Sequence, residues 1–276
     1  MSDIKAMGLY RNVERILADL DASGLGGDHA LRVDDLTPFD QYHYENTAAV
    51  DDAIDALAIG PESHILDIGS GLGGPSRYLA DRTGARVTAL ELQPDLHATA
   101  SSLTSRCELD EWVTHINGDI LAGAAPEHAF EGIVSMLCFL HIPDRETLFE
   151  RCARALKPGG SMFIDDYVER GELTDHERTL LAEKVFCPYL PTLSEYVGQV
   201  EHAGFVVTQT IDKTDEWTRF ANDRLEQFRE RHDELTTRYG DETVAALDEF
   251  YAAIVELFSH GRLGGVRLTA RLVEGD

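Results

Sequence analysis

Closely spaced cysteines are missing from this chain of 276 residues. Its four cysteines, Cys107, Cys138, Cys152 and Cys187, stand far apart. Zinc sites and redox dithiols use cysteines at short paired spacings, so neither kind of site is indicated and no metal is expected. We predict four reduced thiols, mostly buried, because free cysteine packs as a small hydrophobe.

Basic residues are scarce, and lysine is the scarcest of them. The chain has 50 acidic and 24 basic residues, for a net charge of −26, and its lysines are Lys5, Lys157, Lys184 and Lys213. Such a charge repels phosphate backbones and anionic membranes, so neither nucleic acid nor a membrane is expected as a partner. The acidic excess is either a solvated surface or an adaptation to high salt, which screens self-repulsion, and we favour the salt interpretation.

Long apolar runs are also missing. No segment approaches the roughly 18 consecutive apolar residues that suggest a membrane span. Residues 1–20 carry charges throughout, so no secretory signal is predicted and a cytoplasmic location is expected. The length allows one large domain with a cap or two small domains, and we favour one catalytic domain with a cap.

The first sixty residues are predicted to form an N-terminal helical lid, residues 1–60. Apolar residues recur at near-helical spacing over 4–20 and predict an amphipathic helix that ends at the following glycines. Residues 36–44 are predicted to be a loop rich in aromatics. Residues 47–57 are predicted to be a helix with Thr47 as its N-cap.

From residue 61 onward, short apolar runs alternate with helical stretches. Strands are predicted at 64–68, 86–90, 113–116, 132–136 and 161–164, and later at 205–211 and 266–273. This alternation predicts an α/β fold with a doubly wound, mostly parallel seven-stranded sheet, in which the late strands add at least one antiparallel pairing. We expect a Rossmann-like core at 61–168. Residues 169–276 would hold the last two strands and a helical cap, built from 172–203 and 215–260.

The strongest chemical signal is a glycine-rich turn after the first of these strands. The run is His64-Ile65-Leu66-Asp67-Ile68-Gly69-Ser70-Gly71-Leu72-Gly73-Gly74. Glycines let the backbone turn tightly and approach a nucleotide closely. The spacing also satisfies the G-x-G-x-x-G pattern of dinucleotide enzymes, and Glu91 at the second strand end suits the ribose of either cofactor.

Three further features distinguish this chain from a dinucleotide enzyme. They are Asp67 before the turn, Gly118-Asp119-Ile120, and Leu156-Lys157-Pro158-Gly159-Gly160. The set resembles the class I S-adenosylmethionine-dependent methyltransferases. The resemblance implies that the turn faces the methionine half of the cofactor and that Asp119 meets adenine. The cofactor contacts expected on this basis are Gln41, Tyr42, Asp67, Gly69, Ser70, Gly71, Glu91, Leu92, Gln93, Asp119, Ile120, Ser135 and Leu137.

Residues 40–220 resemble, more specifically, the small-molecule N-methyltransferases of the phosphoethanolamine and sarcosine/dimethylglycine type. The matching stretches are the glycine turn, Asp40-Gln41-Tyr42, Phe139-Leu140-His141 and Asp166-Tyr167. The resemblance implies that Tyr42 and His141 are catalytic, closing the site over the cofactor and assisting proton removal.

The chain also departs from this family. Ser135-Met136-Leu137-Cys138 stands where an acidic residue is usual, and Leu137 cannot anchor a substrate ammonium. No basic cluster for phosphate occurs near residues 187–189. A phosphorylated substrate is therefore disfavoured, and an amine remains plausible.

Methyl transfer asks the protein to position a nucleophile and exclude water. An amine must also lose its proton, which suits His141 as general base, although a histidine that only binds a loop is the alternative. Aromatic rings attract cationic groups, and the substrate residues expected on this basis are Tyr44, Tyr167, Tyr189 and Trp217.

The function predicted is S-adenosylmethionine-dependent methylation of a small soluble molecule. N-methylation of a small amino acid or amine, toward a compatible solute, is favoured. The alternatives are S- or O-methylation of a small acid, a nicotinamide-binding oxidoreductase, and a non-catalytic cofactor-binding subunit. The sequence leaves the methyl acceptor and the oligomeric state open.

Overall fold

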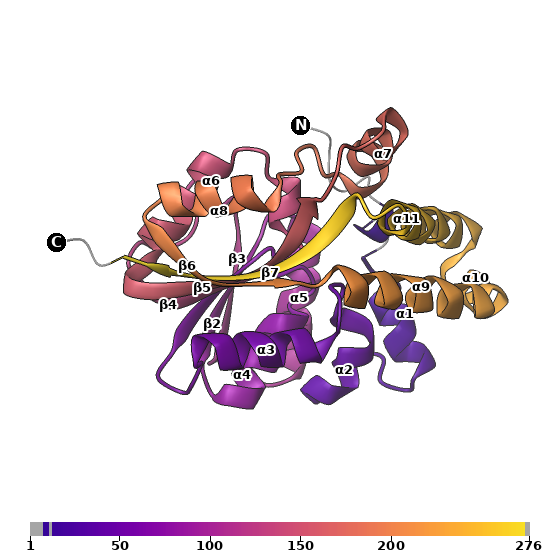
Figure 1. Ribbon diagram of the computed structural model, residues 1–276. Coiled ribbons are helices and arrows are strands. Elements are labelled where there is room, and N and C mark those ends of the chain that lie inside the picture. Colours follow the sequence, from indigo (N-terminus) through magenta and orange to yellow (C-terminus); the bar gives the residue numbers. More distant parts are fainter. Residues whose placement is uncertain (1–7, 11–12, 274–276) are drawn as a thin grey trace.

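The computed structural model describes residues 8–10 and 13–273, and its centre is one seven-stranded sheet (Figure 1). The strand order is β3-β2-β1-β4-β5-β7-β6. The strands are β1 (His64–Ile68), β2 (Arg86–Glu91), β3 (Val113–Asn117), β4 (Phe130–Met136), β5 (Leu156–Glu169), β6 (Phe205–Asp212) and β7 (Leu263–Leu272). All seven predicted strands are confirmed.

The order of the strands reverses direction at the middle of the sheet, between β1 and β4. Strands β1 to β5 pair in parallel, and β7 runs antiparallel to both β5 and β6, as predicted. The chain winds outward from β1 through β2 to β3 and then returns to β4 on the other side of β1. In doubly wound sheets, ligands bind beyond the carboxyl ends of the strands at such a reversal.

Helices cover both faces of the sheet, with α3 and α4 on one face and α6 and α8 on the other (Figure 1). Alternate residues of β1 point to opposite faces, as the pleat requires. Leu66 packs in the cluster that contains Phe149 of α6, whereas Ile65 packs in the cluster that contains Leu79 of α4. The helices are α3 (Thr47–Leu57), α4 (Gly74–Thr83), α5 (Pro94–Arg106), α6 (Arg145–Ala155) and α8 (Leu193–His202).

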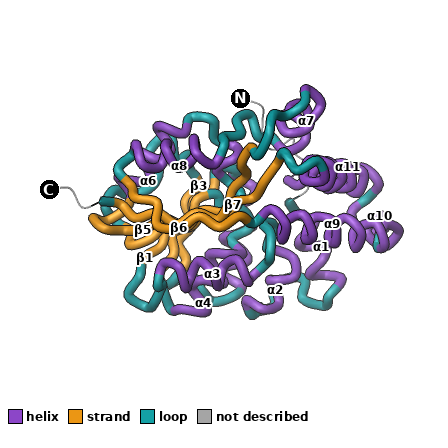
Figure 2. Tube along the Cα trace, in the orientation of Figure 1, coloured by secondary structure: helices purple, strands orange, loops and turns teal. Residues whose placement is uncertain are grey.

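The remaining helices gather beyond one end of the sheet (Figure 2). They are α1 (Arg15–Ala22), α2 (Val33–Asp40), α7 (Asp175–Leu180), a π-helical turn (Leu181–Val185), α9 (Thr214–Glu230), α10 (His232–Tyr239) and α11 (Asp241–Ser259). Of the predicted cap stretch 172–203, only the first part lies here. Helix α8 packs against the sheet, because Tyr196 and Val200 are buried in the same cluster as Phe205 of β6.

The N-terminal region differs from its prediction in two places. Residues 33–40, expected mainly as loop, form α2, whose Leu36 is fully buried among apolar residues of α1. Thr47 is the first residue of α3, and the N-cap is Asn46, with φ of 50°. Within the predicted helix 4–20, the structure has a 3₁₀ turn at Gly8–Tyr10 and α1 from Arg15, while residues 1–7 and 11–12 lie outside the described residues.

The four cysteines are all unbonded to one another. Cys152 and Cys187 are buried, and Cys107 and Cys138 are partly buried. Burial raises the pKa of the Cys107 thiol to about 11 and that of Cys152 to about 12, so these thiols are protonated near neutral pH.

Candidate active site

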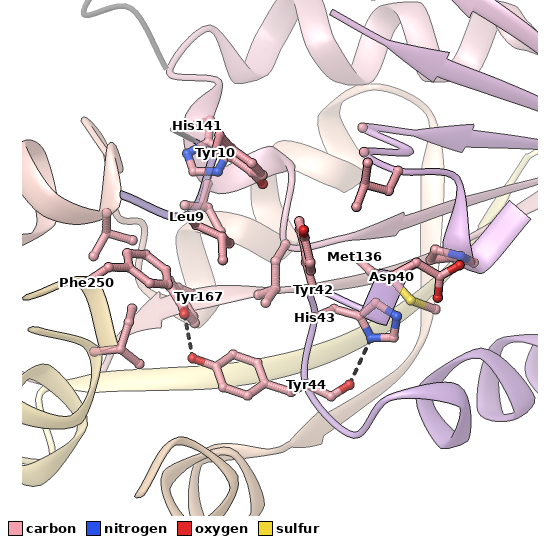
Figure 3. Close-up of a pocket in the computed structure, with 18 of the residues that line it drawn as sticks. Leu9, Tyr10, Asp40, Tyr42, His43, Tyr44, Met136, His141, Tyr167 and Phe250 are labelled. Carbon is pink, nitrogen blue, oxygen red and sulfur yellow. Dashed lines mark hydrogen bonds between the residues drawn. The ribbon is translucent and has the colours of Figure 1, made fainter. Parts of the chain in front are cut away.

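A hollow that is partly open to solvent lies beyond the carboxyl ends of β1 and β4 (Figure 3); its volume is about 910 Å³ when the open solvent within it is counted. One side is formed by the glycine turn and residues 40–44. The other side is formed by the end of β4, the π-helical turn and helices α9 and α11. The hollow occupies the place where the strand order reverses, and it brings together segments from all three predicted regions.

The glycine turn has the backbone geometry that its sequence predicts. Gly69 has φ of 77°, and a β-carbon there would lie 2.4 Å from Sγ of Cys138. Gly71 has φ of 55°, and the position of its β-carbon is open space facing the hollow. The left-handed backbone favours glycine at both positions, and at Gly69 the close approach of Cys138 also leaves no room for a side chain.

Seven buried side-chain polar atoms lack partners among the described residues, and two of the seven belong to predicted cofactor contacts. These two are Oγ of Ser70, in the turn itself, and Oε1 of Gln93, just after β2. Buried polar groups are ordinarily hydrogen-bonded, so such atoms suggest that a ligand completes them. Both residues are predicted cofactor contacts; Ser70 lines the hollow, whereas Gln93 is not among its described lining residues.

Glu91 is the last residue of β2, and its carboxylate contacts both the glycine turn and Gln93. Its Oε2 accepts a hydrogen bond from the backbone N–H of Gly71 at 2.9 Å, and its Oε1 accepts one from Gln93 at 2.8 Å. Burial raises the pKa of this carboxyl, while the two backbone donors oppose that shift. Each carboxylate oxygen has two lone pairs, so Glu91 retains acceptor capacity for ribose hydroxyls.

The other cofactor residues predicted at strand ends have different surroundings. Asp119 accepts a hydrogen bond from the backbone of Leu121 at 2.8 Å, and Ile120 is buried. Leu92 is 56% exposed. Ser135 is fully buried and donates to the carbonyl of Ile68 at 3.1 Å, so it braces β4 against β1.

Asp67 lies at the base of the turn and lines the hollow. It accepts a hydrogen bond from Oγ of Ser76 at 2.5 Å. Burial raises the pKa of Asp67 to about 7. Gln41, by contrast, is absent from the lining residues that the structure describes, because its amide is engaged with Asp40 and His43 at 2.9 Å each.

His141 is held in a defined tautomer. Its Nδ1 lies 3.0 Å from the carbonyl oxygen of Phe186, which can only accept, so Nδ1 carries the proton and Nε2 has the free lone pair. Burial lowers the pKa of His141 to about 4, so the imidazole is neutral at pH 7. The 3₁₀ turn Phe139–His141 brings this residue to the hollow.

Tyr42 lines the same hollow as His141 (Figure 3). The guanidinium of Arg15 lies 4.9 Å from the centre of its ring. Arg224 of α9 donates to the backbone carbonyl of His43 at 3.1 Å and more weakly to that of Tyr42 at 3.5 Å. The backbone at residues 42 and 43 is therefore bound to α9 at the hollow.

Three of the four aromatics predicted for the substrate lie together. Tyr44 and Tyr167 share a hydrogen bond of 2.7 Å between their hydroxyls and line the hollow (Figure 3). Trp217 stacks on Tyr44 with ring centres 4.7 Å apart, is fully buried and is not among the described residues that line the hollow. Tyr189 lies in a separate groove between α6 and α8, where its hydroxyl accepts from Gln199 at 2.8 Å.

Several residues that line the hollow are not predicted from the sequence. Arg224, Phe250, Tyr251 and Ile254 come from α9 and α11, which the sequence marks only as helical. A cation on the apolar side of α9 is the one available signal, since Arg224 falls between buried Ala221 and Leu225. Which partner such a side chain faces depends on how the helices pack.

The fold and the hollow together define the class of protein. A mostly parallel seven-stranded sheet whose last strand, β7, is inserted antiparallel between β5 and β6 is the Rossmann-like methyltransferase fold. Residues 66–164 match the family described as methyltransferase domain. This stretch therefore matches the methyltransferase domain that the sequence predicts.

Known proteins resemble the chain over different lengths. It is 35% identical to phosphoethanolamine N-methyltransferase 2 of Caenorhabditis elegans over 155 residues, which is 56% of this chain and 35% of that protein. It is 25% identical to sarcosine/dimethylglycine N-methyltransferase of Halorhodospira halochloris over 161 residues, 58% of each chain. The structure of Haemonchus contortus phosphoethanolamine N-methyltransferase 2 with S-adenosyl-L-methionine superposes with a TM-score of 0.72 at 21% identity, covering 88% of this chain and 60% of that one. The chain spans about a third of the length of the first of these relatives.

Proposed function

We propose that the chain transfers a methyl group from S-adenosylmethionine to a small molecule, and that the acceptor atom is an amine nitrogen. The observation that carries the proposal is His141, whose Nε2 lone pair is free on the wall of the hollow because Nδ1 is bound to Phe186. Ser70, Glu91 and Gln93 are the proposed cofactor contacts, and the buried, unpartnered Oγ of Ser70 and Oε1 of Gln93 support this.

The residues divide the chemistry between them. S-adenosylmethionine supplies a methyl group on a sulfonium, and the electron pair of the breaking carbon–sulfur bond stays on sulfur. The amine nitrogen forms the new bond to carbon, and the proton of its ammonium form passes to Nε2 of His141. Because the pKa of His141 is about 4, the imidazole is neutral at pH 7 and gives the proton on to water.

One observation favours S- or O-methylation as a second candidate. Leu137, with φ of 56°, lines the hollow where related enzymes are expected to carry an acid, so the site lacks that anchor for an ammonium. A thiol or carboxylic acid needs no such anchor. The nicotinamide alternative has no support, since residues 66–164 match a methyltransferase domain.

The test is methyl transfer from radiolabelled S-adenosylmethionine to a panel of small amines, thiols and carboxylic acids. We expect labelled amines, and a large loss of rate in His141→Ala. Transfer only to thiols or acids would replace the amine proposal by the second candidate. Binding of NAD instead of S-adenosylmethionine in calorimetry would overturn the proposal altogether.

Three broader features also remain proposals. We infer a cytoplasmic enzyme without nucleic acid or membrane partners, supported by the net charge of −26, and within the described residues no helix is long and apolar enough to cross a membrane. The same charge supports a high-salt setting. The division into a lid (1–60), a core (61–168) and a cap (169–276) is supported by a hollow that all three segments line.

A further inference from the structure

The residues that line the hollow outside the glycine turn include a group of apolar side chains. These apolar residues are Leu9, Leu140, Val185, Ala221, Phe250 and Ile254. All but Leu9 pack in one hydrophobic cluster, and Leu9 and Phe250 are labelled in Figure 3. These side chains come from the N-terminal turn, the 3₁₀ turn, the π-helical turn, α9 and α11. Five separate segments thus contribute apolar groups to one wall, whereas Asp40, Asp67 and Ser70 lie on the glycine-turn side.

Three polar side chains of the hollow on the side of β5 and α9 are engaged with the protein. The hydroxyls of Tyr44 and Tyr167 bind each other at 2.7 Å. Arg224, the sole lysine or arginine among the described lining residues, donates to backbone carbonyls of the lid and lies 4.5 Å from the ring centre of Phe220. A carboxylate or phosphate brought here would lose its hydration, and it would have to share Arg224 with those backbone carbonyls, which reduces what it gains.

We propose that the methyl acceptor carries a hydrocarbon arm of several carbons, which packs against Ala221, Phe250 and Ile254. This inference rests on the proposed function, because it takes Tyr42 and His141 to mark the reacting end. The amine would lie beside His141 and the arm would extend between α9 and α11. A small zwitterion such as sarcosine suits this site less well, since it has no hydrocarbon arm to cover these side chains and its carboxylate must compete with backbone carbonyls for Arg224.

The specificity follows from burial of the arm. Each buried methylene contributes about a fourfold gain in kcat/KM, which corresponds to ~0.8 kcal/mol. The gain in kcat/KM stops once the arm is long enough to cover the apolar side chains between α9 and α11. We therefore expect kcat/KM to rise along a series of linear alkylamines from ethylamine to hexylamine, and to be lowest for sarcosine.

The first experiment measures kcat/KM for that series and for sarcosine with S-adenosylmethionine as donor. Sarcosine equal to or better than hexylamine would overturn the apolar arm while leaving methyl transfer intact. If no amine is methylated, the proposed amine methylation is wrong. The binding experiment below then tests the hydrocarbon arm independently of activity.

Two cavity variants and one matched control sharpen the test. Ala221→Leu places a larger side chain into the hollow and should lower kcat/KM for hexylamine at least tenfold while ethylamine changes little. Phe250→Ala enlarges the same wall and should move the optimum to longer chains. Ala245→Leu makes the first substitution on an exposed position of α11 and should leave the series unchanged. Equal effects of Ala221→Leu on both amines would contradict the proposal.

The second experiment measures binding without turnover. Calorimetry on the protein saturated with S-adenosylhomocysteine should show hexylamine binding with a negative heat-capacity change, the mark of apolar burial, and weaker binding to Ala221→Leu. Hexylamine that binds no better than ethylamine, or binds with no heat-capacity change, would overturn the apolar arm whatever the activity.

Discussion

Arg77 of α4 and Asp40 of α2 form an ion pair with Nη2 and Oδ2 2.8 Å apart, and their side chains are 0% and 1% exposed. Arg77 also donates to the carbonyl of Leu72 at 2.6 Å and to Ala100 and Thr104 at 3.2 Å each. The pair therefore ties the end of α2, just ahead of Tyr42, to the helix that follows the glycine turn.

Removing the charge of Asp40 should be strongly destabilising. Asp40→Asn keeps the shape and leaves the buried guanidinium of Arg77 without its partner charge, which typically costs about 3–5 kcal/mol. Urea unfolding measures the loss. Asp34→Asn, in the exposed pair with Arg32, is the matched control and should cost under about 1 kcal/mol. Equal losses in both variants would show that burial of the pair is unimportant.

Glu91→Ala should weaken S-adenosylmethionine binding by about 1–3 kcal/mol, because it removes the acceptor expected for the ribose hydroxyls. Calorimetry gives the affinity directly. Glu91→Gln keeps one acceptor oxygen and should lose less. Unchanged affinity in the alanine variant would mean that the ribose binds elsewhere.

Tyr42 and His141 should act as a unit. Tyr42→Phe removes only a hydroxyl and should lower the rate with little change in cofactor affinity, while His141→Ala should cost about 10²–10⁴ in rate if the imidazole is the general base. The double variant should be no worse than the poorer single one. Rates that are full in both single variants would leave positioning alone as the source of catalysis.

The buried histidine His43 should make stability depend on pH. Burial lowers its pKa to about 4 in the folded protein, against about 6.5 in the unfolded chain. As pH falls through 6.5, the unfolded chain binds a proton that the folded state refuses, so the folded state loses stability until about pH 4.

The free energies of unfolding of the wild type and His43→Gln isolate this effect. Their difference at pH 8 gives the loss of the hydrogen bonds alone, because the histidine is neutral in both states. Between pH 6.5 and 4 the wild type should lose on the order of 3 kcal/mol relative to the variant. A difference independent of pH would show that His43 titrates alike in both states.

Salt should stabilise the protein. Screening shortens the range of repulsion among the excess acidic groups, which give a net charge of −26. The thermal midpoint, measured by circular dichroism, should rise between low and molar salt, and activity should rise with it. A midpoint that stays level or falls would leave the acidic surface as a solubility feature only.

The sequence by itself determined the parts of this protein that depend on local pattern. Apolar runs set the seven strands to within a few residues at most ends, and the glycines of the turn set the left-handed backbone at Gly69 and Gly71. Alternation of strands and helices was enough to predict the doubly wound sheet, because few chain paths satisfy right-handed crossovers.

Tertiary packing decided the rest. The aromatic residues at 36–44 led to the prediction of a loop where the structure has the end of α2. Leu36 of α2 packs with apolar residues of α1, and no local sequence pattern reveals that contact. Tyr189 and Tyr167 carry the same side chain, yet they lie in different places, because α8 turned back onto the sheet while β5 runs to the hollow. The apolar wall exists only where α9 and α11 meet the lid, since side chains far apart in the sequence must be packed together before a cavity has a shape.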